Sequence, residues 1–451
     1  MLLCKNNLKF IILINIFYNF GMSEYFMAVV KKEHYGVQPN QIKFKSVLKN
    51  TIYEALKKRS WKETENDSDF DFYFSEKNYF STESQQQMGY HLLSPHQKVN
   101  HFPNNYELTR KDLMYKNLRR YKKQLEKENR QEESKYFNFY PLTYYMPNEM
   151  AMMIEEYKKT SGALWIMKPA CKAQGRGIFI ITSLSQLISW RNSLKGGSEN
   201  IVNELYVGQK YIMNPLLIGG KKFDMRIYAL TVNYNPLTVY LYRTGFARFT
   251  HMRYSNSIEN ITNNLIHLTN VAVQKTSDNY DPEIGGKWDL RNMKIYLMSI
   301  YGRDKVEKLF AEIQDIVLKS LFSVQKVIVN ERHCFELYGY DILIDDTLKP
   351  WLIEINANPS LSANTPKDNE MKVKMLDDML TILDLEKILT GNEDQVGGFD
   401  LICRGTVVKY PESNKYKTLL GAFNNREKQL KTLSKQTANR LANLYLQKNS
   451  G

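Results

Sequence analysis

The chain has 451 residues, of which 43% are hydrophobic and 12% aromatic, enough for a packed core and two or three domains or lobes. Its four cysteines (Cys4, Cys171, Cys334 and Cys403) lie far apart, with no CxxC pair and no clustered histidines, which argues against a disulfide framework or structural zinc and favours a reducing compartment. The formal net charge of +14 favours polyanionic partners, namely nucleic acid, an anionic membrane or acidic protein tails.

The amino-terminal segment carries no clear targeting signal. Residues 10–20 are apolar apart from two asparagines, but they are too few to span a bilayer, which takes about 20 residues. No small-residue cleavage site of a signal peptide is evident, and a second methionine, Met22, follows. We interpret residues 1–21 as an extension of the gene model or a disordered leader, end the leader at residue 43, and expect no membrane association.

Residues 44–160 are expected to form a smaller N-terminal α/β lobe. Apolar residues at helical spacing predict a helix over residues 44–59, and acids alternating with aromatics predict a strand over residues 67–74.

A long polar helix is predicted over residues 109–128, with Thr109 as its N-cap. Residues 127–134 are charged and predict a loose connection, and a helix restarts over residues 147–159. The Lys and Arg residues of 110–135 are interspersed with acids, so we interpret them as a solvated helix face with i,i+4 ion pairs.

The pattern changes at residue 164 to short strands with tight turns. Strands are predicted over residues 164–168, 177–181, 209–212, 223–233 and 237–243, and helices over residues 288–299 and 306–325. These elements indicate an α+β protein with a mostly antiparallel sheet. We assign residues 161–390 to the central and C-terminal catalytic lobes.

A basic C-terminal extension is predicted over residues 391–451. Residues 404–448 hold ten Lys or Arg residues and only two acids. This unbalanced charge favours contact with a polyanion over a solvated surface.

Two strands near the end of the catalytic region carry the strongest chemical signal. They span residues 339–344 and 351–356. If residues 346–349 form the hairpin loop, Asp345 pairs with Pro350, and Asp341 then falls directly opposite Glu354.

The alternation of side chains along a strand places Glu354 and Asn356 on one face and Ile353 and Ile355 on the other. Like charges directly opposite each other destabilise a sheet, whereas hard oxygen ligands suit Mg²⁺ that bridges nucleotide phosphates. Asp341, Glu354 and Asn356 are therefore predicted to bind metal. The alternative is a solvated pair of acids on a wet sheet face.

A glycine-containing loop follows the predicted strand 164–168. The strand ends in Lys168, and the loop contains Gln174, Gly175 and Gly177. Glycines let backbone N–H groups approach phosphate oxygens. The loop is neither a P-loop nor a dinucleotide-binding fingerprint, so a phosphate contact and an ordinary turn both remain open.

A second polar region follows at residues 209–226. The short strand 209–212 can offer backbone groups to the edge of an adenine. On the next strand Lys222, Asp224 and Arg226 share one face, which suggests a polyanion site whose cations are held by the aspartate. A surface ladder of ion pairs is the competing interpretation.

Two further signals are weak when taken alone. Residues 267–270 form a polar cluster inside an apolar run, and the cations Arg243, Arg248 and Lys287 are scattered along the chain.

The order of these motifs resembles the tubulin tyrosine ligase-like family of ATP-grasp ligases over residues 44 to about 400. The matching motifs are Lys168-Pro169, Gln174-Gly175-x-Gly177, Gln209-x-Tyr211-Ile212, Lys222-Phe223-Asp224-x-Arg226, His267-Leu268-Thr269-Asn270, Gly286-Lys287-Trp288, Tyr340-Asp341 and Glu354-x-Asn356. Within the family, residues 105–111, 323–328 and 396–400 most resemble the ninth polyglutamylase-like type, with the first type a close second.

The resemblance implies a role for each site residue. Phosphate contacts are implied for Lys168, Gln174 and Gly175, and an adenine frame for Gln209, Lys210, Tyr211 and Ile212. Lys222, Phe223 and Asp224 would bind ribose and phosphate, and Thr269 and Asn270 would complete the nucleotide site. Two Mg²⁺ ions would be bound by Asp341, Glu354 and Asn356, and the carboxylates of free glutamate by Arg248 and Lys287. Arg226 is the candidate catalytic residue, stabilising the transferring phosphoryl group.

The implied activity is an ATP-dependent ligation that adds glutamate to glutamate side chains in the acidic tail of tubulin. The acceptor carboxylate is activated as an acyl phosphate, which the amine of free L-glutamate attacks. The alternatives are a glycylase-type ligase and a non-catalytic microtubule-binding subunit of a polyglutamylase complex. Companion subunits are possible partners, no nucleic acid is expected, and the cytoplasm and cytoskeleton, with a cilium axoneme or basal body, are the expected location.

Overall fold

The computed structural model describes residues 41–76, 90–160, 162–196, 204–277, 286–357, 359–409 and 417–449. The interpretation of residues 1–21 lies outside these described residues. No helix within the described ranges is both long and apolar enough to cross a membrane.

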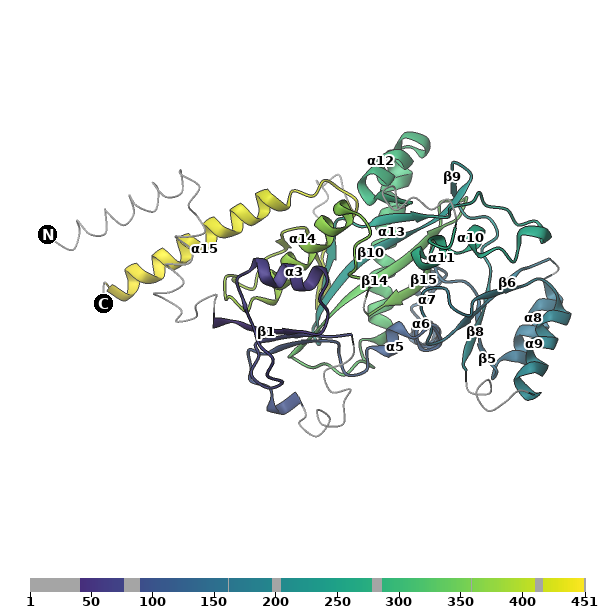
Figure 1. Ribbon diagram of the computed structural model, residues 1–451, viewed down its shortest axis with the longest axis horizontal. Coiled ribbons are helices and arrows are strands. Elements are labelled where there is room, and N and C mark those ends of the chain that lie inside the picture. Colours follow the sequence, from purple (N-terminus) through teal and green to yellow (C-terminus); the bar gives the residue numbers. More distant parts are fainter. Residues whose placement is uncertain are drawn as a thin grey trace.

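A large sheet forms the centre of the molecule, built around two long antiparallel strands, β10 (Lys221–Tyr234) and β14 (Cys334–Ile344) (Figure 1). Antiparallel neighbours extend it on both sides: β9 (Leu217–Ile218), β11 (Leu237–Tyr242), β12 (Phe246–Phe249), β13 (Lys287–Asp289), β15 (Pro350–Asn356), β16 (Gln395–Val396), β17 (Phe399–Arg404) and β18 (Thr406–Val407). Four N-terminal strands continue the sheet in parallel from β14: β4 (Lys98–Asn100), β3 (Phe72–Phe74), β1 (Lys43–Ser46) and β2 (Lys62–Glu63).

Helices cover both faces of this sheet because the strand residues are apolar on both faces. Alternate residues of β10 such as Met225 and Ile227 pack on the side of α6 (Lys111–Lys127), α12 (Leu290–Tyr301) and α13 (Arg303–Val324). Tyr228 and Leu230 pack on the opposite side, under α3 (Thr51–Lys58) and α14 (Pro366–Leu383).

A second, antiparallel sheet of four strands forms a lobe beside the first (Figure 1). Its strands are β5 (Thr143–Met146), β8 (Tyr206–Lys210), β6 (Trp165–Pro169) and β7 (Phe179–Ile181), with α8 (Met150–Lys159) and α9 (Leu184–Gly196) packed on it. The short helices are α5 (Tyr106–Thr109), α7 (Gln131–Lys135), α10 (Asn264–His267), α11 (Val271–Gln274), η3 (Tyr90–Leu92) and η4 (Ile258–Asn260). The final helix, α15 (Arg426–Asn449), points away from the body of the molecule.

The fold class predicted from the sequence, α+β with mostly antiparallel sheets flanked by helices, is confirmed. The proposed division at residues 43, 160 and 390 stays a prediction. The segment after residue 390 supplies β17, which pairs with β11 inside the large sheet.

Several predicted element boundaries were wrong for local reasons. The helix predicted from residue 44 begins only at Thr51, because Asn50 caps it with a side chain that accepts from the Ile52 N–H at 3.3 Å. Thr109 is not the cap of α6; it ends α5, and its hydroxyl donates to the Asn105 carbonyl at 3.2 Å.

Two further segments also differ from prediction. The connection predicted over residues 127–134 contains most of α7, and the strand predicted over residues 209–212 begins earlier and ends at Lys210.

Candidate active site

Polar side chains form two rows across five neighbouring strands of the large sheet. Residues directly opposite each other on neighbouring strands project from the same face. In one row Lys287, Arg248 and Asp224 follow each other across β13, β12 and β10.

The adjacent row crosses β12, β10, β14 and β15 and consists of Phe246, Arg226, Asp341 and Glu354. The register therefore brings three cations and three acids from distant parts of the sequence onto one patch. The ladder of charges predicted on β10 is not a surface feature, because Lys222, Asp224 and Arg226 are all buried.

The predicted pairing of Asp341 with Glu354 is present, but the register of the rest of the hairpin differs from the prediction. Ile344, not Asp345, lies opposite Pro350, and a β-bulge between Asp341 and Ile342 restores the expected pair. Two residues of β15 face one residue of β14 at this point.

Because of the bulge, Ile353 does not lie on the face that was predicted for it. Leu352 and Ile355 are buried in the core, whereas Ile353 is displaced from that face and lines a pocket together with Glu354.

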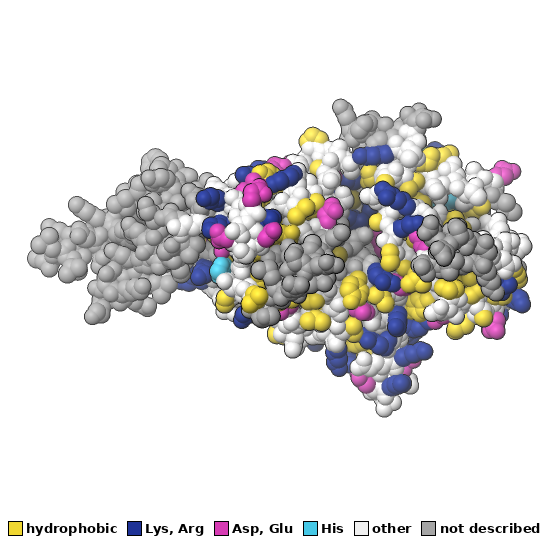
Figure 2. All heavy atoms as spheres, turned by 60° about the horizontal axis from the view of Figure 1, so that its bottom comes forward, with side chains coloured by type: hydrophobic (Ala, Val, Ile, Leu, Met, Phe, Trp, Pro, Cys, Tyr) yellow, Lys and Arg dark blue, Asp and Glu magenta, His cyan; other side chains and the backbone are white. Residues whose placement is uncertain are grey.

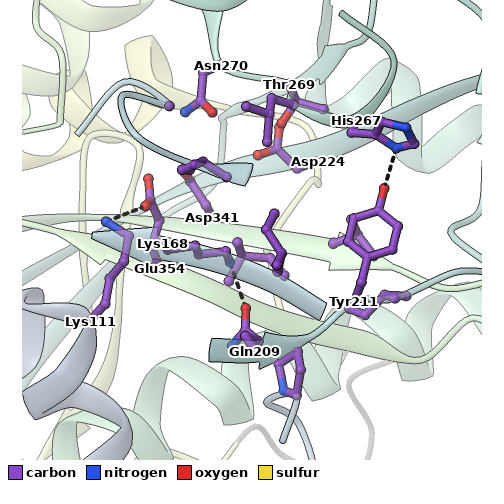
Figure 3. A pocket seen from close by; sticks show the side chains of 18 of the residues that line it. Lys111, Lys168, Gln209, Tyr211, Asp224, His267, Thr269, Asn270, Asp341 and Glu354 are labelled. Atoms are coloured by element: carbon purple, nitrogen blue, oxygen red, sulfur yellow. Dashed lines mark hydrogen bonds and ion pairs between the residues drawn. The ribbon is translucent and has the colours of Figure 1, made fainter. Parts of the chain in front are cut away.

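A pocket lies between this patch and the four-stranded sheet (Figure 3). The predicted site residues that line it are Lys168, Gln174, Gly175, Gln209, Lys210, Tyr211, Ile212, Lys222, Asp224, Thr269, Asn270, Asp341 and Glu354. Seven of the eight matching motifs of the sequence thus meet around one cavity.

One part of the pocket is apolar. Ile166, Tyr211 and Leu268 pack together there, and Ile178 joins them from the far side of the glycine loop. The backbone N–H groups of Lys210 and Tyr211 donate to the Leu142 and Leu164 carbonyls, at 2.8 and 2.9 Å. A planar ring in this slot would contact apolar side chains. Because the N–H groups of Lys210 and Tyr211 are already bonded, hydrogen bonds to the edge of the ring would have to come from other backbone groups.

The glycine loop depends on left-handed backbone conformations. Gln174, Gly175 and Gly177 have φ values of 62°, 78° and 71°. A Cβ atom at Gly175 would lie 2.9 Å from Val273 Cγ2, so only glycine fits against α11 at this position.

Two buried lysines face the pocket. Lys168 Nζ donates to Gln209 Oε1 at 2.6 Å, and Lys222 Nζ donates to Tyr211 Oη and to the His267 carbonyl, both at 3.0 Å. Burial lowers the pKa of Lys168 to about 8. Burial, helped by the charge of Lys168, lowers the pKa of Lys222 to about 7. A bound polyanion would restore both charges.

The carboxylate of Asp341 lies between two guanidinium groups. Arg226 Nε and Nη2 donate to its two oxygens at 2.5 and 3.1 Å, and Arg248 Nη2 lies 2.7 Å from Oδ2. Arg248 also forms a two-point contact with Asp224. Burial alone would raise the pKa of Asp341, but the two arginines hold it well below its ordinary value.

Gly339 makes room for this arrangement. A Cβ atom there would lie 3.2 Å from Arg226 Cδ and 2.6 Å from Pro359 Cβ.

The sequence analysis missed a third buried lysine of the pocket. Lys111 lies 3.3 Å from Glu354 Oε2, and its Nζ donates to the Lys172 carbonyl at 3.1 Å (Figure 3). The interpretation of α6 as a solvated face was wrong here. The signal was present, because Lys111 stands in helical register with the buried Met114 and Leu118.

Other lining residues, such as His267, came from a motif that was noticed but assigned no role.

Some predicted site residues lie outside the pocket lining. Phe223 is buried in the core on the opposite face of β10. Arg226 and Arg248 contact Asp341 and Asp224, which line the pocket. Lys287 lies opposite Arg248 on the next strand. Asn356 lies opposite Gly339, with Nδ2 3.4 Å from Glu354 Oε1.

Arg243, one of the scattered cations to which the sequence analysis gave no role, forms a buried two-point ion pair with Asp400.

The oxygen atoms of the three predicted metal-binding residues are the kind of ligand that a hard cation prefers. Asp341, Glu354 and Asn356 supply carboxylate and amide oxygens from adjacent strands on one face. Within the described residues, no group of three or more His, Cys, Asp and Glu side chains is placed to hold a metal. A cation here would rely on two carboxylates and an amide. Asp341 contacts Arg226 and Arg248, and Glu354 contacts Lys111.

Comparison with known proteins places the chain among relatives of similar length. A profile described as the Tubulin-tyrosine ligase family matches residues 85–394. The chain is 42% identical to the probable tubulin polyglutamylase TTLL9 of Rattus norvegicus, over 88% of this chain and 93% of that protein. It is 48% identical to the probable alpha-tubulin polyglutamylase Ttll1 of Tetrahymena thermophila, over 64% and 73%. The chain belongs to the tubulin-tyrosine ligase family.

Proposed function

We propose that this protein is an ATP-dependent ligase that adds glutamate to glutamate side chains in the acidic tail of tubulin. The observation that carries the proposal is the pocket in which the glycine loop, three buried lysines and the Asp341–Glu354 pair converge. Relatives that match most of the chain are named tubulin polyglutamylases, which supports the substrate.

The pocket suits a nucleoside triphosphate in shape and charge. The apolar slot beside Tyr211 would take the base, and Lys111, Lys168 and Lys222 would hold the phosphates together with the glycine loop. The charge of Glu354 is balanced by Lys111. Each of these lysines is buried and polar contacts hold it in place, so little reorganisation would be needed on binding.

The residues that would bind magnesium are Asp341, Glu354 and Asn356. When bound, two Mg²⁺ ions would neutralise charge on the β- and γ-phosphates. Asp341 would then share its carboxylate between a cation and Arg226.

The chain's own groups account for the ligation step. A tail carboxylate must be activated before an amine can displace its oxygen, and Arg226 is positioned by Asp341 to stabilise charge on the transferring phosphoryl group and on the tetrahedral intermediate. No nucleophilic Ser or Cys is required. Cys334 and Cys403 are buried and act as packing residues.

The cations in the row of Lys287, Arg248 and Asp224 favour glutamate over glycine as the added amino acid. Arg248 and Lys287 are neighbours across β12 and β13, which provides for two carboxylates. A glycine needs only one, so a glycylase-type reaction is the weaker candidate.

The surface charge supports an acidic acceptor. In Figure 2 Lys and Arg side chains gather on the lower part of the visible face with few acids among them. Exposed basic residues also line the described part of α15, including Lys428 and Lys431. Such surfaces steer acidic partners and lose affinity with salt. A cytoskeletal location follows from the substrate, and a cilium or basal body is the proposed site within the cell.

A test compares ADP release by the wild type and by Glu354→Gln, each with tubulin and glutamate. We expect turnover that requires both substrates and a loss of at least about 100-fold in the variant. A microtubule-binding scaffold with a relic nucleotide site would instead release no ADP above background in either protein.

A further inference from the structure

A chain of hydrogen bonds leads from the short helix η4 to one of the buried lysines of the pocket. The ring of His267, at the end of α10, is 3% exposed, and its Nε2 atom lies 3.1 Å from the carbonyl oxygen of Asn260 in η4. Its Nδ1 atom lies 2.9 Å from Tyr211 Oη (Figure 3). Lys222 Nζ in turn lies 3.0 Å from Tyr211 Oη. Three side chains and one carbonyl group therefore form a continuous series of contacts.

The chemistry of these groups fixes the direction of each hydrogen bond. A carbonyl oxygen only accepts, so Nε2 of His267 must carry a hydrogen and donate to Asn260. The other nitrogen of a neutral ring has only a lone pair, so the Tyr211 hydroxyl donates to Nδ1. An ammonium group only donates, so Lys222 donates to the Tyr211 oxygen. Each donor of the chain thus faces an acceptor.

The ring of His267 is neutral in this arrangement. Burial, followed by the charge of Lys222, lowers the pKa of His267 to about 4, although the Asn260 carbonyl acts in the opposite direction. Tyr254 packs edge-on against the same ring, and burial raises its pKa, so this neighbour adds no charge. Because both ring nitrogens of His267 are already bonded, the ring is poorly suited to proton transfer in the ligation step.

Lys222 is the group that benefits from the neutral ring. Its ammonium group donates to Tyr211 Oη and to the His267 carbonyl. Burial and the nearby charge of Lys168 lower the pKa of Lys222, and Asp224 on the same strand raises it. A hydroxyl that already donates to His267 presents only lone pairs to the lysine, and hydrogen bonds in such a chain strengthen one another. The chain therefore favours the charged form of Lys222.

We propose that His267 is a positioning residue for nucleotide binding, which acts on Lys222 through the Tyr211 hydroxyl. It fixes this hydroxyl as a donor to its own ring, so that the oxygen faces Lys222 as an acceptor. The inference rests on the proposed function, since it takes Lys222 as a ligand of the phosphates. A histidine that only filled space would be replaceable by other side chains of similar size.

Two substitutions separate the roles of the two ring nitrogens. His267→Asn places an amide oxygen near the position of Nδ1, where it can still accept from Tyr211. His267→Gln reaches toward the position of Nε2 and can donate to the Asn260 carbonyl, but it leaves the Tyr211 hydroxyl without its acceptor. His96→Gln is the control, because His96 is exposed and pairs with Asp71 at 2.9 Å outside the pocket.

The measurement is calorimetry of Mg·ATP binding at pH 7 in buffers of different ionisation enthalpy, which gives both the Kd and the number of protons taken up. With a pKa of about 7, Lys222 is about half charged at pH 7, so binding takes up about 0.5 proton at this residue in the wild type. Losing a hydrogen bond to a charged group shifts a protonation equilibrium about tenfold. This would leave Lys222 about 9% charged and raise the uptake to about 0.9 proton.

We therefore expect His267→Gln to bind Mg·ATP about fivefold more weakly at pH 7 and to take up more protons than the wild type. A purely structural role of the histidine would not change the number of protons. His267→Asn should stay within about twofold of the wild type in Kd, and His96→Gln should match the wild type.

Equal proton uptake by the wild type and a folded His267→Gln would overturn the inference, as would the same loss of affinity in the Asn and Gln variants. Loss of the folded state in both His267 variants would assign the residue to the fold alone and would overturn it too. Failure of the wild type to bind Mg·ATP would instead contradict the proposed function, so the two failures are distinguishable.

Discussion

Nucleotide binding by this protein should take up protons, because two lysines of the pocket are partly neutral before the ligand arrives. Burial lowers the pKa of Lys222 to about 7 and that of Lys168 to about 8, and phosphate contacts favour their charged forms. Raising the pH above 7 therefore removes charge from the free protein. Affinity for ATP must fall as the pH rises, since binding then has to recover the missing protons.

The size of the effect follows from the two pKa values. Between pH 7 and pH 8.5 the charged fraction of Lys222 falls from about one half to about 3%, and that of Lys168 from about 90% to about 24%. Affinity should weaken about 16-fold from the first lysine and about fourfold from the second, or roughly 60-fold together if they act independently. The nucleotide adds little, because a phosphate monoester loses its last proton near pH 6.

Isothermal titration calorimetry of Mg·ATP binding measures this linkage. Titrations at pH 8.5 in buffers of different ionisation enthalpy should reveal uptake of more than one proton per nucleotide. In Lys222→Met the decline between pH 7 and pH 8.5 should shrink to the fourfold share of Lys168. Equal affinity of the wild type at both pH values, without proton uptake, would refute the assignment of these lysines to the phosphates.

Three further outcomes are expected. Gly175→Ala and Gly162→Ala both place alanine at positive φ, so both should lower stability by about 1 kcal/mol. The new methyl group would meet a close neighbour at Gly175 but none at Gly162, so only Gly175→Ala should raise the KM for ATP. Arg243→Met breaks a buried ion pair and should cost about 3–5 kcal/mol in urea unfolding, whereas ATP affinity of the folded fraction stays unchanged. Replacing Lys428 and Lys431 with glutamate should weaken microtubule co-sedimentation at low salt, and no loss relative to an equal charge change on α8 would exclude α15 from binding.

The sequence predicted the chemistry of the site better than the boundaries of its elements. The pairing of Asp341 with Glu354 was predicted from an assumed hairpin loop, and the structure has it because a bulge offsets the different register at the loop. The bulge at Ile353 was not predictable, because register depends on how the turn is bonded. Asp345 accepts from the Thr347 and Lys349 N–H groups and from Trp351 Nε1. These bonds make Asp345 part of the loop, which is one residue longer than predicted.

The two missed residues, Lys111 and Asp368, were missed for different reasons. Lys111 was hidden inside a basic helix whose other charges are exposed, such as Lys116 and Lys123, so composition gave the wrong interpretation although helical register was informative. Asp368 lies 81 residues from its partner Lys287. Only the packing of α14 on the sheet brings the two together, and no local pattern encodes such a contact.

The central claim is that the pocket around Asp341 and Glu354 energises a tail carboxylate for coupling to free glutamate. Mass spectrometry of tubulin tails after incubation with the purified protein, ATP, Mg²⁺ and glutamate tests it most directly. The account predicts tails heavier by whole glutamate residues, linked through a glutamate side chain, with the wild type and none with Glu354→Gln. Tails that stay unmodified although the wild type is folded, or tails that gain only glycine, would contradict it.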